Sequence, residues 1–263
     1  MSASGSTTTQ KTDGGIPVRV WVGYALPRLR QGKGRLEFYE SLGSIFIPAT
    51  VQIMQPLGLT AYLPTVLPAN NNPAIPDEIA LVFYPSCRHY EQAKNSSTGG
   101  RAYQKLHSTI FNFQPLPEAP KSHSSFPLLF DQASNKQLPN GNYSLFSTTV
   151  NWQTGNPVVL VAGFNTEARS RTIQRLENIQ RSPPEGLDGL IFALQNDFIV
   201  VWAHWRHEPA TRNILEGIEG LRIIVNSSYE SLTLPMPVTT SFPGIPVTAG
   251  RSFNFQFNTL PKT

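Results

Sequence analysis

Cysteine is nearly absent from this sequence, and charged residues are sparse. Cys87 is the single cysteine among 263 residues. One cysteine excludes an internal disulfide and a zinc site built on cysteine ligands. As a nucleophile Cys87 would need a group that stabilises its thiolate, and no histidine–acid pair can be assigned to it. Asp, Glu, Lys and Arg together make up 14% of the chain, which predicts a weakly charged surface.

Long hydrophobic runs and dense positive charge are also missing. No apolar run approaches the roughly 18 residues of a membrane span, and no hydrophobic leader follows Met1. We therefore expect a soluble, cytoplasmic protein with no membrane partner. The net charge of +4 includes one dense cluster, formed by Arg28, Arg30, Lys33 and Arg35. It lacks the interleaved aromatics of a nucleic-acid surface, so we predict a solvated loop and no nucleic-acid partner.

Familiar catalytic signatures do not occur. The chain contains neither of the glycine-rich loops that hold phosphates, GxGxxG and GxxxxGK[ST]. It also lacks the HExxH helix of zinc proteases and the GxSxG turn of serine hydrolases. These absences argue against nucleotide-dependent and zinc-dependent chemistry. The candidate site must then be sought among isolated histidines and the aromatic residues around them.

The strongest pattern that is present lies in residues 186–206, where two apolar runs flank a polar turn at 195–197. Both runs are rich in β-branched and aromatic residues, so we predict a β-hairpin. The second run is apolar on both faces, because its alternate residues form two sets. These sets are Phe198, Val200, Trp202 and His204, and Ile199, Val201, Ala203 and Trp205. A strand covered on both faces belongs at the centre of a sheet.

The order of predicted elements occurs twice along the chain. The first half has a strand at 17–26, a helix at 34–57 that Pro48 should kink, strands at 59–67 and 78–84, and helical pieces at 87–94 and 101–111. The second half has a strand at 157–164, a helix at 166–181, the hairpin, and a helix-like segment at 209–225. Pro157–Phe164 resembles Pro17–Tyr24 with Pro157 aligned to Pro17. We interpret this as an internal repeat.

This order divides the chain into five parts. They are a disordered tail at 1–15, a first repeat at 16–125, a connecting hairpin at 126–150 around Asn140-Gly141, a second repeat at 151–231, and a C-terminal strand and arm at 232–263. The arm or the edge strands would be the means of forming a homo-oligomer.

A β-α-β-β-α unit used twice is the ferredoxin-like plan, an α+β fold. Four segments carry a further resemblance: Phe46-Ile47-Pro48, 58–62, Glu78–Tyr84 and Tyr103–Phe111. With these segments, residues 17–111 resemble the dimeric α+β-barrel superfamily, particularly its EthD-like and antibiotic-monooxygenase-like branches. The resemblance implies a barrel-like body in which one chain supplies both halves. It also implies a pocket for a small, mostly apolar molecule. Some members are cofactor-free oxygenases, cyclases or decarboxylases, and some larger relatives bind heme. EthD-like sequences often carry a histidine where this chain has Ile47, so that catalytic residue is absent.

Two other histidines are the candidate catalytic residues. His204 ends the buried strand beside Trp202, where an imidazole could act as a general base or a heme ligand. The alternative is a structural histidine bonded to backbone. His107 shares a predicted helix face with Tyr103 and Phe111, and that face either looks into a pocket or belongs to the core. Predicted ligand-binding residues are Trp21, Tyr24, Phe83, Tyr103, Trp202 and Arg206.

Three functions fit these observations. The first is a pocket protein, enzymatic without metal or cofactor, acting on an aromatic or polyketide-like substrate. The second is a non-catalytic interaction or assembly module, which the sparse charge and Ile47 favour. The third is a heme-binding protein, which requires a histidine that faces a porphyrin-sized opening. Under the first and third, His204→Ala should abolish ligand binding and leave the fold intact.

Overall fold

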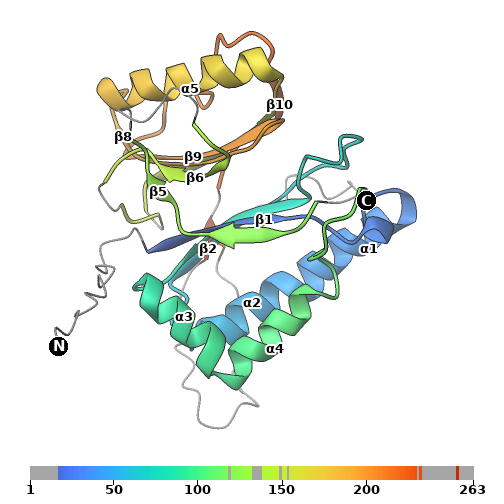
Figure 1. Ribbon diagram of the computed structural model, residues 1–263. Coiled ribbons are helices and arrows are strands. Elements are labelled where there is room, and N and C mark those ends of the chain that lie inside the picture. The colour runs from blue at the N-terminus through green and yellow to red at the C-terminus, as the bar shows by residue number, and fades with distance from the viewer. Residues whose placement is uncertain are drawn as a thin grey trace, which may run out of the picture.

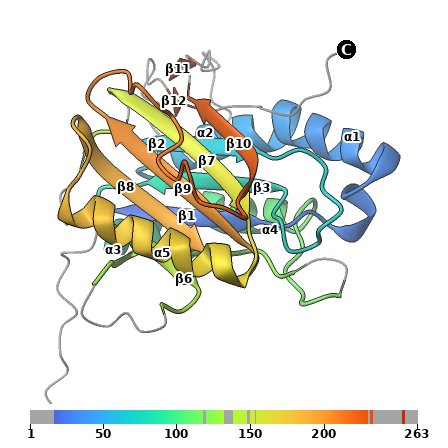
Figure 2. The same cartoon turned by 90° about the horizontal axis from the view of Figure 1, so that it is seen from above.

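The computed structural model of this protein describes residues 17–117, 120–131, 138–147, 150–152, 154–229, 231–232 and 253–254. In these residues the chain is mixed α+β with two main β-sheets. The sheets lie face to face and helices cover the outer side of each, so the layers run helix, sheet, sheet, helices (Figure 1). Seen from above, the strands of one sheet cross those of the other at an angle (Figure 2).

The first half forms a sheet in the order β2-β3-β1-β4, with neighbouring strands antiparallel. Its strands are β1 (Val18–Gly23), β2 (Ala61–Val66), β3 (Glu78–Phe83) and β4 (His123–Ser125). Its helices are α1 (Gly32–Ser41), α2 (Ile47–Met54), α3 (Cys87–Ser96) and α4 (Thr98–His107). β2 lies at an edge, where a strand tolerates a proline such as Pro64.

The second half forms a sheet in the order β10-β7-β9-β8-β6-β5. Its strands are β5 (Leu128–Leu129), β6 (Gly141–Ser144), β7 (Asn156–Gly163), β8 (Leu187–Leu194), β9 (Phe198–Trp205) and β10 (Arg222–Ser228). The helix α5 (Thr166–Arg181) covers its outer face. When β7 to β10 are numbered 1 to 4, their order across the second sheet is 4-1-3-2. The order of β1 to β4 across the first sheet is the same, which agrees with the predicted repeat.

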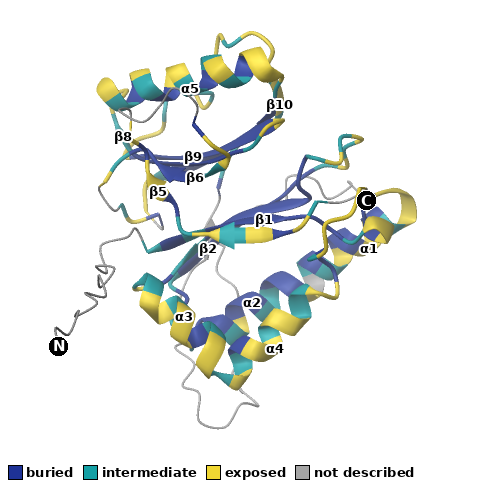
Figure 3. Ribbon diagram, viewed as in Figure 1, coloured by how far each residue is buried: buried dark blue, intermediate teal, exposed yellow. Residues whose placement is uncertain are grey.

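Alternation along the strands sends every second side chain into the space between the sheets. Val20 and Leu81 of the first sheet meet Val200 and Trp202 of the second there, in one apolar cluster. The facing sides of both sheets are buried along most of their length (Figure 3). The central position predicted for β9 is therefore confirmed, with one set of its residues between the sheets and the other under α5. The described strand pairings leave two separate sheets, so the expected barrel closure is not found in them.

Pro48 produces the predicted irregularity in the first helical stretch. Between α1 and α2 the chain makes a π-helical turn at Leu42–Phe46, and α2 begins with Pro48 in its first turn. Proline has no N–H to donate, and its ring clashes with the carbonyl four residues earlier in a regular helix. A wider π turn relieves that clash and also rotates the side chains that follow. Phe46 and Thr50, on either side of Pro48, face the same cavity.

The basic cluster does not form a fully solvated loop as predicted. Arg30 and Arg35 are buried and both pair with Asp77, whose oxygens lie 2.9 Å and 2.5 Å from their guanidinium nitrogens. The backbone N–H of Ala25 donates to the same carboxylate at 2.8 Å. A buried cation is stable only when it is paired, and Asp77 supplies the charge for both. The other two cluster members, Arg28 and Lys33, are exposed.

Two predicted elements are wrong. The described residues of 126–150 do not form a hairpin, because β5 and β6 pair in parallel and β6 instead joins β8. Residues 209–225 do not form a helix but a series of turns that leads into β10. Gly217 and Gly220 have φ of 81° and 85° there, a conformation that no α-helix contains. The described segment between β9 and β10 therefore contains no counterpart of α3 and α4.

The predicted tail at 1–15 and most of the predicted arm at 232–263 lie outside the described residues. Two short strands, β11 (Ser231–Leu232) and β12 (Phe253–Asn254), pair antiparallel, so a C-terminal strand is present. None of the helices in the described ranges is long and apolar enough to cross a membrane.

Candidate functional site

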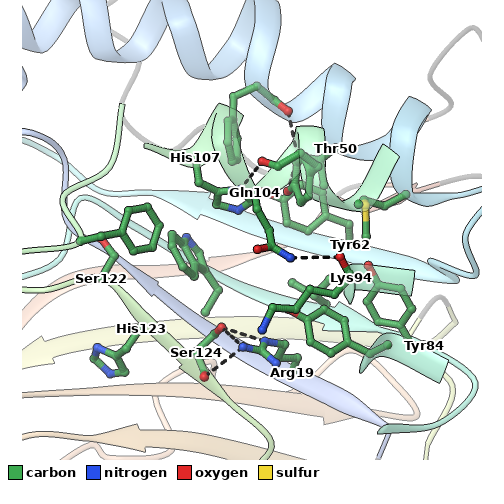
Figure 4. A pocket seen from close by; sticks show the side chains of 18 of the residues that line it. Arg19, Thr50, Tyr62, Tyr84, Lys94, Gln104, His107, Ser122, His123 and Ser124 are labelled. Atoms are coloured by element: carbon green, nitrogen blue, oxygen red, sulfur yellow. Dashed lines mark hydrogen bonds between the residues drawn. The ribbon is translucent and has the colours of Figure 1, made fainter. Parts of the chain in front are cut away.

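A cavity of about 540 Å³ lies in the first half, between the outer face of its sheet and the helices α2, α3 and α4. Seven of its nineteen lining residues are aromatic. The aromatic residues are Trp21, Phe46, Tyr62, Tyr84, Tyr90, Tyr103 and Phe113. Its polar and charged lining residues include Arg19, Thr50, Lys94, Gln104, His107, Lys121, Ser122, His123 and Ser124. In Figure 4, Arg19 and Ser124 on the strands face Thr50 and His107 on the helices.

The periodicity of each element explains why these residues meet. On β1, Arg19 and Trp21 alternate with valines that point between the sheets, so both face the helices. On α4, Tyr103 and His107 are four residues apart and lie on one face of the helix. Gly23 lets the indole of Trp21 pack closely against β1, because a Cβ there would lie 2.7 Å from Nε1 of Trp21.

His107 ends α4 and carries the most distinctive chemistry of the cavity. Its Nδ1 lies 2.8 Å from the backbone oxygen of Tyr103. A carbonyl oxygen only accepts, so Nδ1 holds the proton and Nε2 keeps its lone pair. Burial lowers the pKa of the imidazole to about 4; the Tyr103 carbonyl opposes this, and the charge of Arg19 adds to it. At neutral pH His107 is therefore an uncharged acceptor, and no described residue donates to Nε2.

Thr50 and Tyr103 join the two helices across the top of the cavity. The hydroxyl of Thr50 donates to the backbone oxygen of Phe46 at 2.8 Å. Its oxygen lies 2.7 Å from the Tyr103 hydroxyl, which must therefore be the donor to Thr50. Burial raises the pKa of Tyr103 well above its usual value. Tyr103 is thus a fixed neutral phenol, and its backbone and side chain hold α2 and His107 in place together.

Glu78 lies below the floor of the cavity and is completely buried. Tyr62 donates its hydroxyl to one carboxyl oxygen at 2.8 Å, and the indole N–H of Trp21 donates to the other at 2.6 Å. Burial raises the pKa of this carboxyl to about 7, although both hydrogen bonds act in the opposite direction. Glu78 therefore fixes two aromatic walls of the cavity and titrates near neutral pH.

Positive charge gathers on the side of the cavity formed by β1, β4 and α3. Arg19 donates from Nε to the Ser124 hydroxyl at 2.7 Å, and its guanidinium lies 4.2 Å from the ring centre of Tyr90. The Nζ atom of Lys94 lies 5.9 Å from the same ring. The ring of Tyr90 thus lies near two cationic side chains, and both of them line the cavity.

The predicted site residues fall into two groups. Trp21, Tyr103 and His107 line the cavity and are brought together there. Tyr24, Phe83 and Trp202 instead pack at the interface between the sheets, where Trp202 is fully buried. Arg206 lies on the surface, with Nε 3.5 Å from a carboxylate oxygen of Asp188.

His204 lies in the other half, at the end of β9, and does not line this cavity. Its Nδ1 is 2.5 Å from a carboxylate oxygen of Asp188, and its Nε2 is 2.6 Å from the backbone oxygen of Thr154. Both ring nitrogens thus face acceptors. This is the arrangement of a structural histidine that joins β9 to β8 and to the loop before β7. Its catalytic role stays a prediction that this geometry does not favour.

Sequence reasoning missed Glu78, Tyr62 and Arg19. The signal for Glu78 was its phase in the strand, because it alternates with Ala80 and Val82 on a buried face. A carboxylate on a buried face requires partners. Its donors, Tyr62 and Trp21, belong to other strands, and only strand pairing brings them within reach.

Metal and heme binding were tested against this geometry. The described residues contain no group of three or more His, Cys, Asp or Glu that could hold a metal ion. Five aromatic rings surround the imidazole of His107, with centres 4.3 to 6.4 Å from its own. Rings packed this closely do not favour a porphyrin at Nε2, and heme binding stays a prediction.

Comparisons with known proteins add little to this site. No family model matches the sequence, and no curated protein matches it. A "putative monooxygenase" from Lactobacillus acidophilus NCFM aligns with a TM-score of 0.35 at 6% identity, over 81% of this chain and 94% of that one. A protein of the same description from Fusobacterium nucleatum aligns with a TM-score of 0.35 at 8% identity, over 73% and 76%. Likeness at this level carries no argument about activity.

Proposed function

We propose that this protein binds a small aromatic molecule with an ionisable hydroxyl in the cavity between the first sheet and α2–α4. In this proposal the hydroxyl hydrogen-bonds to Nε2 of His107. The reaction that follows from this arrangement is removal of the hydroxyl proton, as the first step of a cofactor-free oxygenase or cyclase. The proton passes to Nε2, and the electron pair stays on the substrate oxygen as a phenolate or enolate.

The observation that carries the proposal is the tautomer of His107. Its Nδ1–H is held by the Tyr103 carbonyl, which leaves Nε2 as an acceptor in a cavity that seven aromatic residues help to line. An apolar cavity of a few hundred Å³ with one or two oriented polar groups is the usual form of a small-molecule site. The same hydrogen bond would stabilise the imidazolium once Nε2 is protonated.

The experiment is a binding titration with two uncharged probes of nearly equal size, 2-naphthol and 2-methoxynaphthalene, followed by calorimetry. The first donates a hydrogen bond and the second does not. We expect 2-naphthol to bind roughly fivefold more tightly, the equivalent of one neutral hydrogen bond. In His107→Phe the two probes should bind equally, because the ring is kept and the lone pair is lost.

The matched control is His207→Phe, since His207 is exposed in the second half and does not line the cavity. It should bind both probes as the unchanged protein does. If 2-naphthol has no advantage, or if the advantage survives in His107→Phe, then His107 is not the acceptor. If neither probe binds, the cavity does not serve an aromatic ligand and the proposal fails.

The expected homo-oligomer and the assembly function remain predictions. Sparse surface charge motivates them, and Leu128 and Leu129 on the short strand β5 are exposed. The mass of the purified protein in solution measures this directly.

A further inference from the structure

The cavity has an unbalanced charge that the proposed function does not use. Three of its lining residues, Arg19, Lys94 and Lys121, are cationic at neutral pH, and no aspartate or glutamate is among the described residues that line it. The nearest acid to Arg19 is Glu91, whose carboxylate oxygen lies 3.7 Å from Nη1 and whose side chain is half exposed. A site that binds only neutral aromatic molecules gains nothing from such an arrangement.

We propose that the natural ligand is an aromatic carboxylic acid whose carboxylate docks between Arg19 and Lys94 while its ring occupies the aromatic cavity. This inference rests on the proposed function, because it concerns the second end of the same ligand.

Arg19 is held in place before any ligand arrives. Its Nε and Nη2 donate to Ser124, and its guanidinium plane is supported by Tyr90 at 4.2 Å. Its side chain is 15% exposed, so it is largely shielded from water and still reachable from the cavity. Nη1 pairs with Glu91, a half-exposed carboxylate whose oxygen lies 3.7 Å away. A fixed, partly desolvated guanidinium with N–H groups to spare suits a carboxylate, which pays less ordering entropy on binding there.

The spacing of the lining sets the shape of the ligand. Arg19 and Trp21 are two residues apart on β1, which corresponds to roughly 7 Å. The ring of His107 lies 5.3 Å from that of Trp21. The carboxylate and the hydroxyl must therefore sit at opposite ends of an extended aromatic body, such as a bicyclic hydroxy acid.

A docked carboxylate would also change His107. Burial is the main cause of the lowered pKa of His107; the Tyr103 carbonyl opposes it, and the positive charge of Arg19 lowers the pKa further. An anion beside Arg19 offsets that charge and favours the imidazolium. The acid group of the ligand thus makes Nε2 a stronger base when, and only when, the substrate is in place.

The test uses 6-hydroxy-2-naphthoate and its methyl ester, which has the same body without the charge. We expect the acid to bind at least tenfold more tightly than the ester. Arg19→Gln and Lys94→Met should each weaken the acid and leave the ester unchanged, and Glu91→Gln should tighten the acid several-fold by removing the competing carboxylate. Arg28→Gln and Lys105→Met are the controls, because both residues are exposed and lie outside the cavity.

A second readout separates a docking role from a structural one. The imidazole NMR titration of His107 should move to higher pH with the acid and stay in place with the ester. Equal affinity for acid and ester would overturn the inference and leave the proposed function standing, provided that 2-naphthol binds. An acid preference that survives Arg19→Gln and Lys94→Met would also overturn it. Failure of 2-naphthol, the acid and the ester together would remove both proposals.

Discussion

Four strands in each half of this protein have the same order, and the two halves use that order differently. In the first, the space between sheet and helices contains a cavity with charged and hydroxyl-bearing walls. In the second, the corresponding space beneath α5 is filled by aliphatic and aromatic side chains such as Leu176, Ile179 and Phe192. The strand plan alone therefore does not decide whether a helix–sheet layer binds a ligand.

One row of residues across each sheet shows where the halves diverge. In the first sheet, Tyr62, Val82 and Arg19 lie side by side on neighbouring strands. In the second, the row is Phe192, Val201 and Leu160. The second row has Phe192 where the first has Tyr62, and Leu160 where the first has Arg19. Its side chains contain no polar atoms, so none of them needs a hydrogen-bond partner beneath α5. The polar members of the first row have partners within their own half instead: the Tyr62 hydroxyl donates to Glu78, and Arg19 donates to Ser124.

The largest effect on stability should come from placing the arginine of the first row at the matching position of the second. Leu160→Arg places a cation beneath α5, where the surrounding cluster is apolar. We expect a loss of about 4 kcal/mol in the free energy of unfolding, because an unpaired buried charge is among the costliest changes in a core. The reverse change, Arg19→Leu, should cost less than about 1 kcal/mol, since Arg19 borders a cavity. Urea denaturation measures both. Similar losses for the two would mean that the layers do not differ as described.

The next effect concerns the buried carboxyl of the first half. Because burial raises the pKa of Glu78 from 4.5 to about 7, the folded protein keeps this proton longer than the unfolded chain does. The contribution of Glu78 to stability is therefore greatest below pH 4.5 and is lost as pH rises through 7, by at most about 3 kcal/mol. Glu78→Gln cannot ionise and should lose this pH dependence. Thermal unfolding from pH 4 to 8 records it.

Asp197 offers the matched control for that experiment, because it directly precedes β9 and is exposed. Asp197→Asn should leave the profile of the unchanged protein intact. If Glu78→Gln and Asp197→Asn give the same profile, then Glu78 does not titrate as its burial requires.

A smaller effect is expected from the phenol that distinguishes the two rows. Tyr62→Phe removes a donor to Glu78 and should cost about 2 kcal/mol at pH 8, where the carboxylate is charged. At pH 5, where the carboxyl is neutral, the loss should be about 1 kcal/mol. Tyr143→Phe is the comparison in the second half, since that hydroxyl donates to the Pro139 carbonyl at 2.9 Å. Its loss should not depend on pH, and a Tyr62→Phe loss that is equally constant would contradict the hydrogen bond to an ionising group.

The smallest effect should be that of His204 on ligand binding. Because both of its ring nitrogens are engaged outside the cavity, His204→Asn should change the affinity for 2-naphthol by less than about twofold. The same titration calorimetry used for His107→Phe measures it. A tenfold loss would restore the sequence-based prediction that His204→Ala abolishes binding and would move the site to the second half.

The sequence predicted the elements better than it predicted the site. Local patterns identified β1, β3, α5 and the hairpin of β8 and β9, because periodicity and turn residues determine them. The alignment of Pro17 with Pro157 was one residue out of phase, since Val18 points between the sheets and Val158 points toward α5. Strands have a period of two, so a slip of one residue exchanges the two faces.

The site depends on pairing that no local pattern contains. His107 and Tyr103 were found because they share a helix face, whereas Trp202 and His204 were chosen for a strand that faces the other sheet. Glu78 gains its partners only when β1, β2 and β3 align. The place of β6 likewise depends on β8, a strand far along the chain.

The apolar cluster between the sheets joins both halves within one polypeptide, and this has a consequence for stoichiometry. In an assembly of two identical subunits, any change to one cavity is copied into the other. Here the helix–sheet layer of one half can change without the other. Among the described residues, the acceptor His107 and the cations that line the cavity belong to the first half. Saturation should therefore be reached at one molecule of ligand per chain, with a simple hyperbolic isotherm and no communication between like sites.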